Sequence, residues 1–398
     1  MCENEPSNPI NEQLISWVKV LMICSGLWEG PVGVRRIVKN LYNVYSRFMK
    51  FSFFFFCFSL TLEFLRLAIG GYDTDIVFMK YQLAELFNEI IKKEQQVWAS
   101  GSEEIQALYR SKVKFVKGTV LTLFLPSLVT VFMLQVVGGL ATLKIRQYNS
   151  INNASLESHL MYQAIFPLNR INHLNWLFLS EILWGWTGLT YASVTHLIYI
   201  TILVYAATQL QILQIRFRNL MGSEEELSPT QGEVLEGARK LREHIITHKI
   251  IIRFLVQFNN TTKHIIMVDF LCYSLDIASV LSSITKMRIT EAGFFIFYFL
   301  TLFVQLVMTA WSCNEVTVQS EALGDALFQS KWYLLDQQSQ RNVLFILKRI
   351  RKPLHMTIGI FGPMTTNTIV LVLKAAYSYV NLILTLASVA VLAKLIFR

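Results

Sequence analysis

The chain reads FVKGTVLTLFLPSLVTVFMLQVVGGL over residues 115–140, and Lys117 is the only charged residue in that stretch. A helix needs about 20 mostly apolar residues to cross a hydrocarbon core about 30 Å thick, so this segment predicts a transmembrane helix. Similar runs recur along the 398 residues, of which 53% are hydrophobic and only 16% charged. Soluble domains carry about 25% charged residues. The composition therefore predicts an all-α membrane protein.

These apolar runs predict seven transmembrane helices. The runs lie at about residues 51–70, 76–91, 115–140, 177–212, 249–284, 294–313 and 365–386. The second run is the weakest, because Glu85 and Glu89 dilute its inner half; without it the count falls to six. The fourth and fifth runs are longer than a bilayer requires and should project into the cytosol as helices.

The distribution of positive charge predicts an intracellular amino terminus and an extracellular carboxy terminus. Most of the 36 Lys and Arg residues fall on the amino-terminal side of the proposed topology, which the positive-inside rule places in the cytosol. No secretory signal peptide is visible at the start of the chain. The net charge of +9 lies in clusters between apolar runs, so anionic membrane lipids explain it better than nucleic acid.

The same pattern divides the chain into four regions. We expect a cytosolic amino terminus with an interfacial helix at 1–50 and six spans at 51–314, with cytosolic extensions at 213–262. A cytosolic helical region should follow at 315–360, and the last span with its tail should occupy 361–398.

Helices outside the membrane are predicted from periodicity. The interfacial helix should cover about 14–27, and a charged helix should restart at 232–242 before the fifth span. Two further helices are expected over about 316–335 and 339–354. The second of these should carry Leu344, Leu347 and Ile350 on an apolar face, and Gly359, Gly362 and Pro363 should break it before the last span.

No motif of catalysis or cofactor binding is present. The chain lacks a zinc-protease helix, a phosphate loop, a dinucleotide fingerprint and a serine elbow, so we expect neither an enzyme nor a cofactor. His244 and His248 lie one helical turn apart and could hold a metal, but without a third ligand we interpret them as a solvated pair. The five scattered cysteines are interpreted as small buried packing residues.

Two places match the N-glycosylation acceptor pattern. Asn153-Ala154-Ser155 lies in the expected outer loop at 144–173, which makes Asn153 the candidate. At the second place, Asn259-Asn260-Thr261 and Asn260-Thr261-Thr262 both match but lie in or near a span.

Aromatic and small polar residues recur on the outer halves of several spans. Such walls suit a small, mostly apolar molecule, because burial supplies affinity and one or two hydrogen bonds give orientation. Ordinary helix packing is the alternative for each position. The candidate residues are Phe78, Tyr81, Gln82, Phe132, Gln135, Trp184, Tyr191, Phe270, Tyr273, Ser274, Phe295 and Tyr298.

Short motifs near the carboxy terminus resemble a known signature. Trp332-Tyr333, Lys352-Pro353 and Lys374-Ala375-Ala376-Tyr377-Ser378-Tyr379 follow one another in the order found in insect odorant receptors. The last helix lacks the Thr-Tyr start and Gln-Phe end expected of gustatory receptors. The resemblance implies an odorant-gated, non-selective cation channel with seven spans. The short loop between spans four and five favours a ligand-tuned subunit over the olfactory coreceptor.

The resemblance also implies a pore and a partner. In that family the last helices of four subunits surround one pore, which would put Leu382, Thr385 and Leu386 at gate positions. It further implies a heterotetramer with the olfactory coreceptor in the plasma membrane of olfactory sensory neurons. A seven-span G-protein-coupled receptor is the main alternative; it predicts an extracellular amino terminus and an Asn-Pro-x-x-Tyr motif, which this chain lacks.

Overall fold

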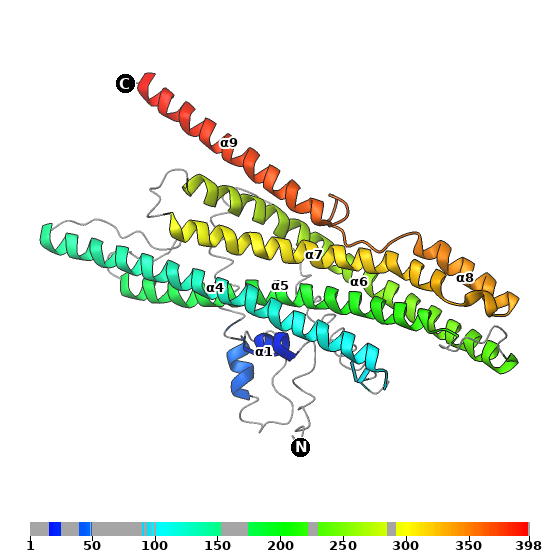
Figure 1. The fold of residues 1–398 in the computed structure, drawn as a ribbon. Coiled ribbons are helices and arrows are strands. Elements are labelled where there is room, and N and C mark those ends of the chain that lie inside the picture. Colours follow the sequence, from blue (N-terminus) through cyan, green and yellow to red (C-terminus); the bar gives the residue numbers. More distant parts are fainter. Residues whose placement is uncertain are drawn as a thin grey trace, which may run out of the picture. The chain divides into compact units, whose positions relative to one another are not determined.

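The computed structural model describes most of the chain (Figure 1). The described residues are 16–24, 40–47, 49, 90, 94–95, 97–98, 101–152, 174–221, 230–284 and 292–396. Within them, regular structure is helical apart from an isolated bridge between Thr357 and Pro363. The named helices are α1 (Ser16–Cys24), α4 (Glu103–Asn152), α5 (Leu174–Arg218), α6 (Gln231–Ile284), α7 (Gly293–Gln329), η2 (Trp332–Leu334), α8 (Gln337–Ile350) and α9 (Thr366–Ile396). The all-α fold class is confirmed.

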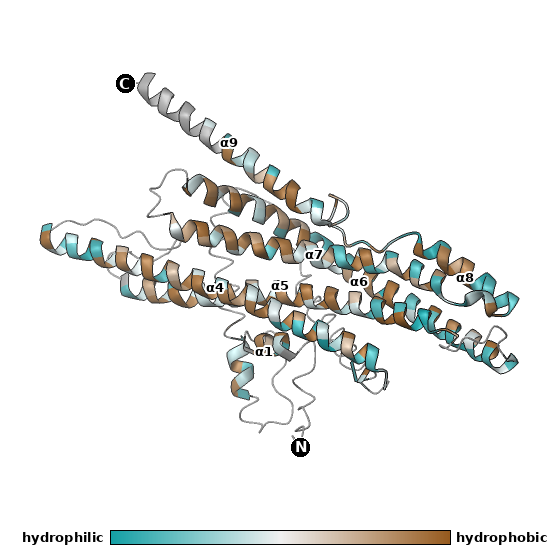
Figure 2. Ribbon diagram, in the orientation of Figure 1, coloured by the Kyte–Doolittle hydropathy of each residue, from teal (hydrophilic) through white to brown (hydrophobic). Residues whose placement is uncertain are grey.

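Four of these helices, α4 to α7, are long and apolar enough to cross a membrane. Figure 2 shows apolar residues along much of each helix and polar residues toward the amino-terminal end of α6. At 1.5 Å per residue, α6 is about 80 Å long, far more than a bilayer core of about 30 Å. The predicted projection of α5 and α6 as helices therefore agrees with their lengths.

Helix α6 begins at a capping box. The Thr230 backbone N–H donates to Glu233 Oε2 at 2.7 Å, and Glu233 N–H donates to Thr230 Oγ1 at 3.4 Å. The two side chains thus satisfy donors that the first helical turn leaves free. From there α6 continues unbroken to Ile284, so the expected separate helix at 232–242 is the first part of the fifth span helix.

Helix α7 is likewise continuous from Gly293 to Gln329. The sequence predicted a span ending near Cys313 and a new helix from Val316, but the residues between them include neither Gly nor Pro and do not interrupt the helix. Helix α4 extends to Asn152, so the first part of the expected loop at 144–173 is helical. Asn153 and the first two predicted spans, except Ile90, lie outside the described residues.

Helix α8 differs from its prediction at both its end and its buried face. It ends at Ile350 rather than 354, and its buried residues are Ser339, Val343, Ile346 and Ile350. Leu344, predicted on the apolar face, is 57% exposed beside Phe345 at 72%. The packed face follows i, i+4, i+7 spacing from Ser339, which turns Leu344 outward.

The other predicted elements have mixed outcomes. Helix α1 lies within the range predicted as an interfacial helix, and it is helical as expected. Helix α9 covers the predicted last span from Thr366 onward and continues through most of the tail. Cys313 is buried as expected, whereas Cys272 is exposed, so the packing interpretation was wrong for Cys272. The four region boundaries and the orientation of the termini stay predictions.

Helix α8 begins at Asp336, whose side chain accepts hydrogen bonds from the backbone N–H groups of Gln338 (3.1 Å) and Ser339 (3.3 Å). Hydrogen bonds to Ser339 lower the pKa of Asp336. Because that pKa is depressed, the cap stabilises α8 above the carboxyl's unfolded pKa and is lost as pH falls through the folded value.

Asp336→Ala should speed amide exchange in the first turn of α8 by about fivefold at pH 7, since losing an N-cap costs about 1 kcal/mol. Hydrogen-exchange mass spectrometry of the solubilised protein measures this. Asp336→Asn, which can still cap, should exchange much more slowly than Asp336→Ala, and exposed Asp325→Ala serves as the control. Equal exchange in all three variants would remove the capping role.

Candidate functional site

The described chain forms two compact units, which we describe separately. The first includes Lys117–Ile198 and Thr290–Thr301. The second includes Gln95–Val116, Tyr199–Ile289 and Leu302–Arg398.

In the first unit, Gln135 joins α4 to α5. Its Nε2 donates to the Ile182 carbonyl at 3.3 Å, and its Oε1 accepts from Trp186 Nε1 at 3.1 Å. Gly139 allows the same helices to approach closely, since a Cβ there would lie 3.2 Å from Phe178 Cζ. Amide groups between apolar helices are commonly paired in this way. Trp186 was absent from the predicted set, which named its neighbour Trp184.

The remaining predicted residues of this unit lie on three helices. Phe132 is 58% exposed on α4, Trp184 is half-buried and Tyr191 buried on α5, and Phe295 is half-buried on α7. Tyr298 stacks on Phe294, with ring centroids 6.2 Å apart. Their contact with a ligand stays a prediction.

In the second unit, Tyr273 and Ser274 are buried and Phe270 is half-buried on α6. The Ser274 hydroxyl donates to the Leu271 carbonyl at 2.7 Å, within its own helix. Phe78, Tyr81 and Gln82 lie outside the described residues. An open groove of about 560 Å³ on α6 contains none of the predicted residues; Lys249, Ile252, Arg253, Val256, Gln257, Asn260 and Thr261 line it.

Helix α9 has one buried face and one exposed face. Val372, Ala376 and Val380 are buried on the first, and α9 makes its main described helix contact with α6. Leu382 is 55% exposed on the second, and Thr385 is exposed with its hydroxyl donating to the Asn381 carbonyl at 2.8 Å. The backbone of Leu386 is helical, but its side chain lies outside the described residues.

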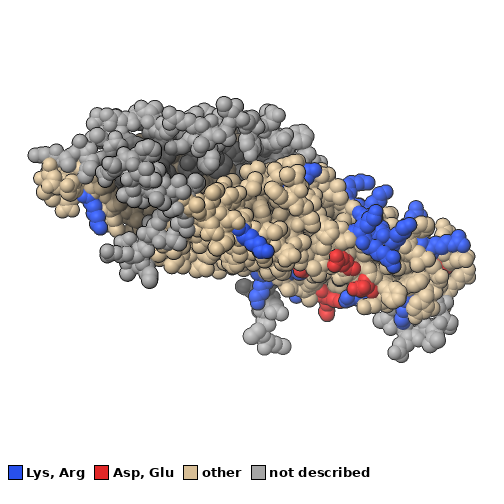
Figure 3. Space-filling model, turned by 90° about the horizontal axis from the view of Figure 1, so that it is seen from above, with Lys and Arg blue, Asp and Glu red and all other residues tan. Residues whose placement is uncertain are grey.

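The residues of the carboxy-terminal signature occupy several elements of the second unit. Trp332 and Tyr333 form part of η2, and Lys352 and Pro353 follow the end of α8. Lys374, Tyr377, Ser378 and Tyr379 lie on α9, where the Ser378 hydroxyl donates to the Lys374 carbonyl at 3.0 Å. Figure 3 shows Lys and Arg side chains gathered over part of the visible face. Lys348, Arg349, Arg351 and Lys352 are all exposed at the end of α8.

The segment between α8 and α9 is a tight hairpin, Met356–Met364. Ile358 N–H donates to the Gly362 carbonyl at 2.9 Å, and Met364 N–H donates to the Met356 carbonyl at 2.7 Å. Gly359 (φ 48°) and Gly362 (φ 95°) adopt left-handed conformations that favour glycine. These residues were predicted to break the preceding helix, but that helix has already ended at Ile350 and they shape the hairpin instead.

The histidine pair on α6 is packed rather than solvated. His248 is 7% exposed, and His244 is half-buried with Phe217 edge-on at 5.6 Å. Burial lowers the pKa of both imidazoles to about 4, helped by Arg216 and Lys240 at His244 and by Arg349 at His248. The interpretation as a solvated pair was wrong. Within the described ranges, no group of three His, Cys, Asp or Glu could hold a metal.

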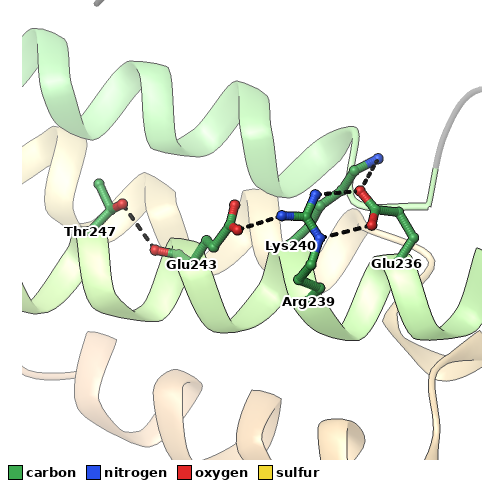
Figure 4. Close-up of polar contacts among 5 residues, drawn as sticks. All are labelled: Glu236, Arg239, Lys240, Glu243 and Thr247. Atoms are coloured by element: carbon green, nitrogen blue, oxygen red, sulfur yellow. Dashed lines mark hydrogen bonds and ion pairs between the residues drawn. The ribbon is translucent and has the colours of Figure 1, made fainter.

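A group of charged side chains, Glu236, Arg239, Lys240 and Glu243, precedes His244 on α6 (Figure 4). Arg239 donates to both oxygens of Glu236, at 2.8 and 2.7 Å, and to Glu243 Oε1 at 2.7 Å. These side chains are exposed, and such pairs contribute little to stability. The cluster extends the helix into water without forming a site.

The long apolar helices, together with the buried faces that pack them, define a multi-pass α-helical membrane protein. A solved structure shares the fold: the insect olfactory receptor OR5 from Machilis hrabei, in complex with eugenol, matches with a TM-score of 0.60 and 16% identity over 94% of this chain and 99% of that one. A second structure of the same receptor matches with a TM-score of 0.60 and 15% identity over 94% of this chain and 97% of that one.

The chain belongs to the insect odorant receptor family, because a family model described as 7tm Odorant receptor matches residues 74–377. Odorant receptor Or2 of Anopheles gambiae is 26% identical over 189 residues, 46% of this chain and 49% of that one. Odorant receptor 30a of Drosophila melanogaster is 25% identical over 195 residues, 48% and 49% respectively. The matches thus span about half the length of these curated relatives. The family is one of receptors rather than enzymes.

Acidification should destabilise the amino-terminal part of α6. Both histidines have a folded pKa near 4, below the unfolded value of about 6.5, so their contribution is present above pH 6.5 and is lost as pH falls toward 4. His248→Leu should reduce the fall in thermal midpoint of the solubilised protein between pH 7 and 4.5. The control His264→Leu, at an exposed position on the same helix, should leave this pH-dependent fall unchanged. A pH dependence equal to wild type in His248→Leu would contradict this.

Proposed function

We propose that the chain is the ligand-tuned subunit of an odorant-gated, non-selective cation channel. Membership of the odorant receptor family carries the proposal. The ligand would be a small, volatile, mostly apolar molecule bound in the outer half of the helical bundle. The solved OR5 receptor with this fold is described in complex with eugenol, which supports a ligand of that size.

The exposed face of α9 supports a pore-lining role. Leu371 and Leu382 lie on it at 60% and 55% exposure, while small and branched residues fill the buried face. A large apolar surface on one chain suggests contact with other subunits or a hydrophobic constriction that excludes hydrated ions. In a tetramer this face would surround the pore, with Leu382, Thr385 and Leu386 at the gate.

The exposed apolar pair on α8 supports assembly with the olfactory coreceptor. Leu344 and Phe345 stand outward on a helix whose other exposed residues include Arg341, Lys348 and Arg349. An apolar pair among charges on a region expected in the cytosol is typical of an interface. We propose that this region joins a heterotetramer in the plasma membrane of olfactory sensory neurons.

The proposed channel function is tested by whole-cell recording while a panel of volatile molecules is applied. Cells would express this chain with the coreceptor, this chain alone and the coreceptor alone, with G-protein signalling blocked. We expect a fast cation current that requires both chains. Surface protein without any evoked current, together with an extracellular amino terminus in a protease-protection assay, would favour the G-protein-coupled alternative.

Cysteine accessibility separates the two faces of α9. In a Cys272→Ser background, Leu382→Cys should become sensitive to a water-soluble thiol reagent, with most of the evoked current blocked, because the side chain would face the open pore. Val380→Cys, on the buried face, is the matched control and should be insensitive. Equal sensitivity at the two positions would exclude the proposed pore face.

The gate is tested at the next apolar position along the same helix. Leu386→Ser should raise the resting current, since a polar group in an apolar constriction lowers the barrier to water and ions. Resting current is measured as the fraction removed by a pore blocker, normalised to surface protein. Unchanged resting and evoked currents would remove Leu386 from the gate.

A further inference from the structure

The side chain of Asn259 on α6 binds the Met356–Met364 hairpin. Its Oδ1 accepts from the Thr357 backbone N–H at 2.8 Å and lies 3.2 Å from the Thr357 hydroxyl, and its Nδ2 lies 3.0 Å from the same hydroxyl oxygen. Both polar ends of the amide are therefore used by one residue of the hairpin. A half-buried amide bonded in this way is unavailable as a glycosylation acceptor, although Asn259 matches that pattern.

The hairpin also packs closely against Met267, which follows Asn259 about two turns later on α6. Gly359 lies so near Met267 that a Cβ on the glycine would stand 2.5 Å from Met267 Sδ. Both the polar contact at Asn259 and the apolar contact at Met267 come from α6, the helix along which α9 packs. The hairpin therefore has both a polar and an apolar contact with α6.

Helix α7 contacts Leu354, just before the hairpin, and Met364, its last residue. The Thr317 hydroxyl donates to the Leu354 carbonyl, and the Ser320 hydroxyl accepts from the Leu354 backbone N–H, both at 3.0 Å. At the other end, the Cys313 thiol lies 3.5 Å from Met364 Sδ and 3.4 Å from the Tyr199 hydroxyl. Tyr199 stacks on Phe258, the residue before Asn259, with ring centroids 5.5 Å apart. The hairpin thus has contacts on both α6 and α7.

The hairpin leads directly into α9. Thr365 N–H donates to Thr368 Oγ1 at 3.0 Å, and α9 begins at Thr366, two residues after Met364. Hydrogen bonds are directional, whereas the apolar contacts along α9 are not. The bonds of Asn259 thus fix the start of α9 relative to α6 more strictly than the packing along the helix does.

We propose that Asn259 is a positioning residue that couples α6 to the start of α9, so that a displacement of α6 on odorant binding reaches the pore. This inference rests on the proposed channel function. The residue touches neither ligand nor ion; it acts through the hairpin. Without its bonds, α6 moves while the start of α9 stays in its resting position.

The test records single channels from the full chain expressed with the coreceptor. Asn259→Leu keeps the approximate volume and removes both polar ends, and it should lower open probability at saturating odorant by at least about fivefold, as expected for losing two neutral hydrogen bonds. Unitary conductance should stay at the wild-type value, because α9 itself is unchanged. Asn260→Leu, exposed at the next position, is the matched control and should behave as wild type.

A second pair of variants acts from the hairpin side. Thr357→Val removes the hydroxyl but keeps the backbone N–H, and should lower open probability by a smaller factor; Thr357→Ser keeps both groups and should restore it. The double variant Asn259→Leu, Thr357→Val should be no worse than Asn259→Leu alone, since both remove the same contact. If Asn259 only stabilised the fold, its substitution would lower the number of channels at the surface and leave their open probability unchanged.

The outcomes separate this inference from the proposed function. Wild-type open probability in Asn259→Leu, with odorant-evoked current intact, would overturn the coupling role and leave the channel standing. If Asn259→Leu does not reach the surface, equal open probability in Thr357→Val and Thr357→Ser overturns it instead. Absence of any evoked current from the wild-type pair would overturn the proposed function, and the coupling with it.

Discussion

Every backbone N–H and C=O inside a bilayer must find its hydrogen-bond partner within the protein, because lipid supplies none. Helices satisfy this requirement internally, which explains why α4 to α7 run without a break through and beyond their apolar stretches. Pro126 lies inside α4 without ending it, and the Thr130 hydroxyl bonds back to the Pro126 carbonyl at 2.8 Å. The same constraint makes non-helical segments costly, so each one present requires compensating polar contacts.

Buried backbone groups outside the bilayer also need partners, and the segment between α8 and α9 finds them in side chains of neighbouring helices. The Leu354 N–H and C=O are taken by Ser320 and Thr317, and the Thr357 N–H is taken by Asn259. The positions of these three polar residues follow from the need to satisfy an irregular backbone, and the same bonds give the segment a defined place on both helices.

Sequence alone could predict the helices, because hydrophobic length and periodicity are local properties. The start of α6 is also predictable from sequence, since Thr230 and Glu233 have capping-box spacing. The continuity of α7 was missed. Polar Asn314 and Glu315 follow the predicted end of the span, but they continue the helix, and Glu315 faces Lys112 at 3.8 Å. Asn259 was ambiguous for a different reason: its partner Thr357 lies 98 positions away. The face of α8 that packs likewise depends on distant residues.

The two kinds of contact on α9 determine how it could move. Val372, Ala376 and Val380 make apolar contacts, which tolerate small tilts, whereas the hairpin before Thr366 is held by directional bonds. In the proposed coupling, the hairpin acts as the pivot. Leu382 lies about 24 Å along the helix from Thr366 at 1.5 Å per residue, so a tilt of about 5° at the pivot displaces it by about 2 Å. Under the proposed function, a shift of α6 too small to disturb its own packing is enlarged at the gate. This requires that the pivot stay bonded to α6 while the rest of α9 swings.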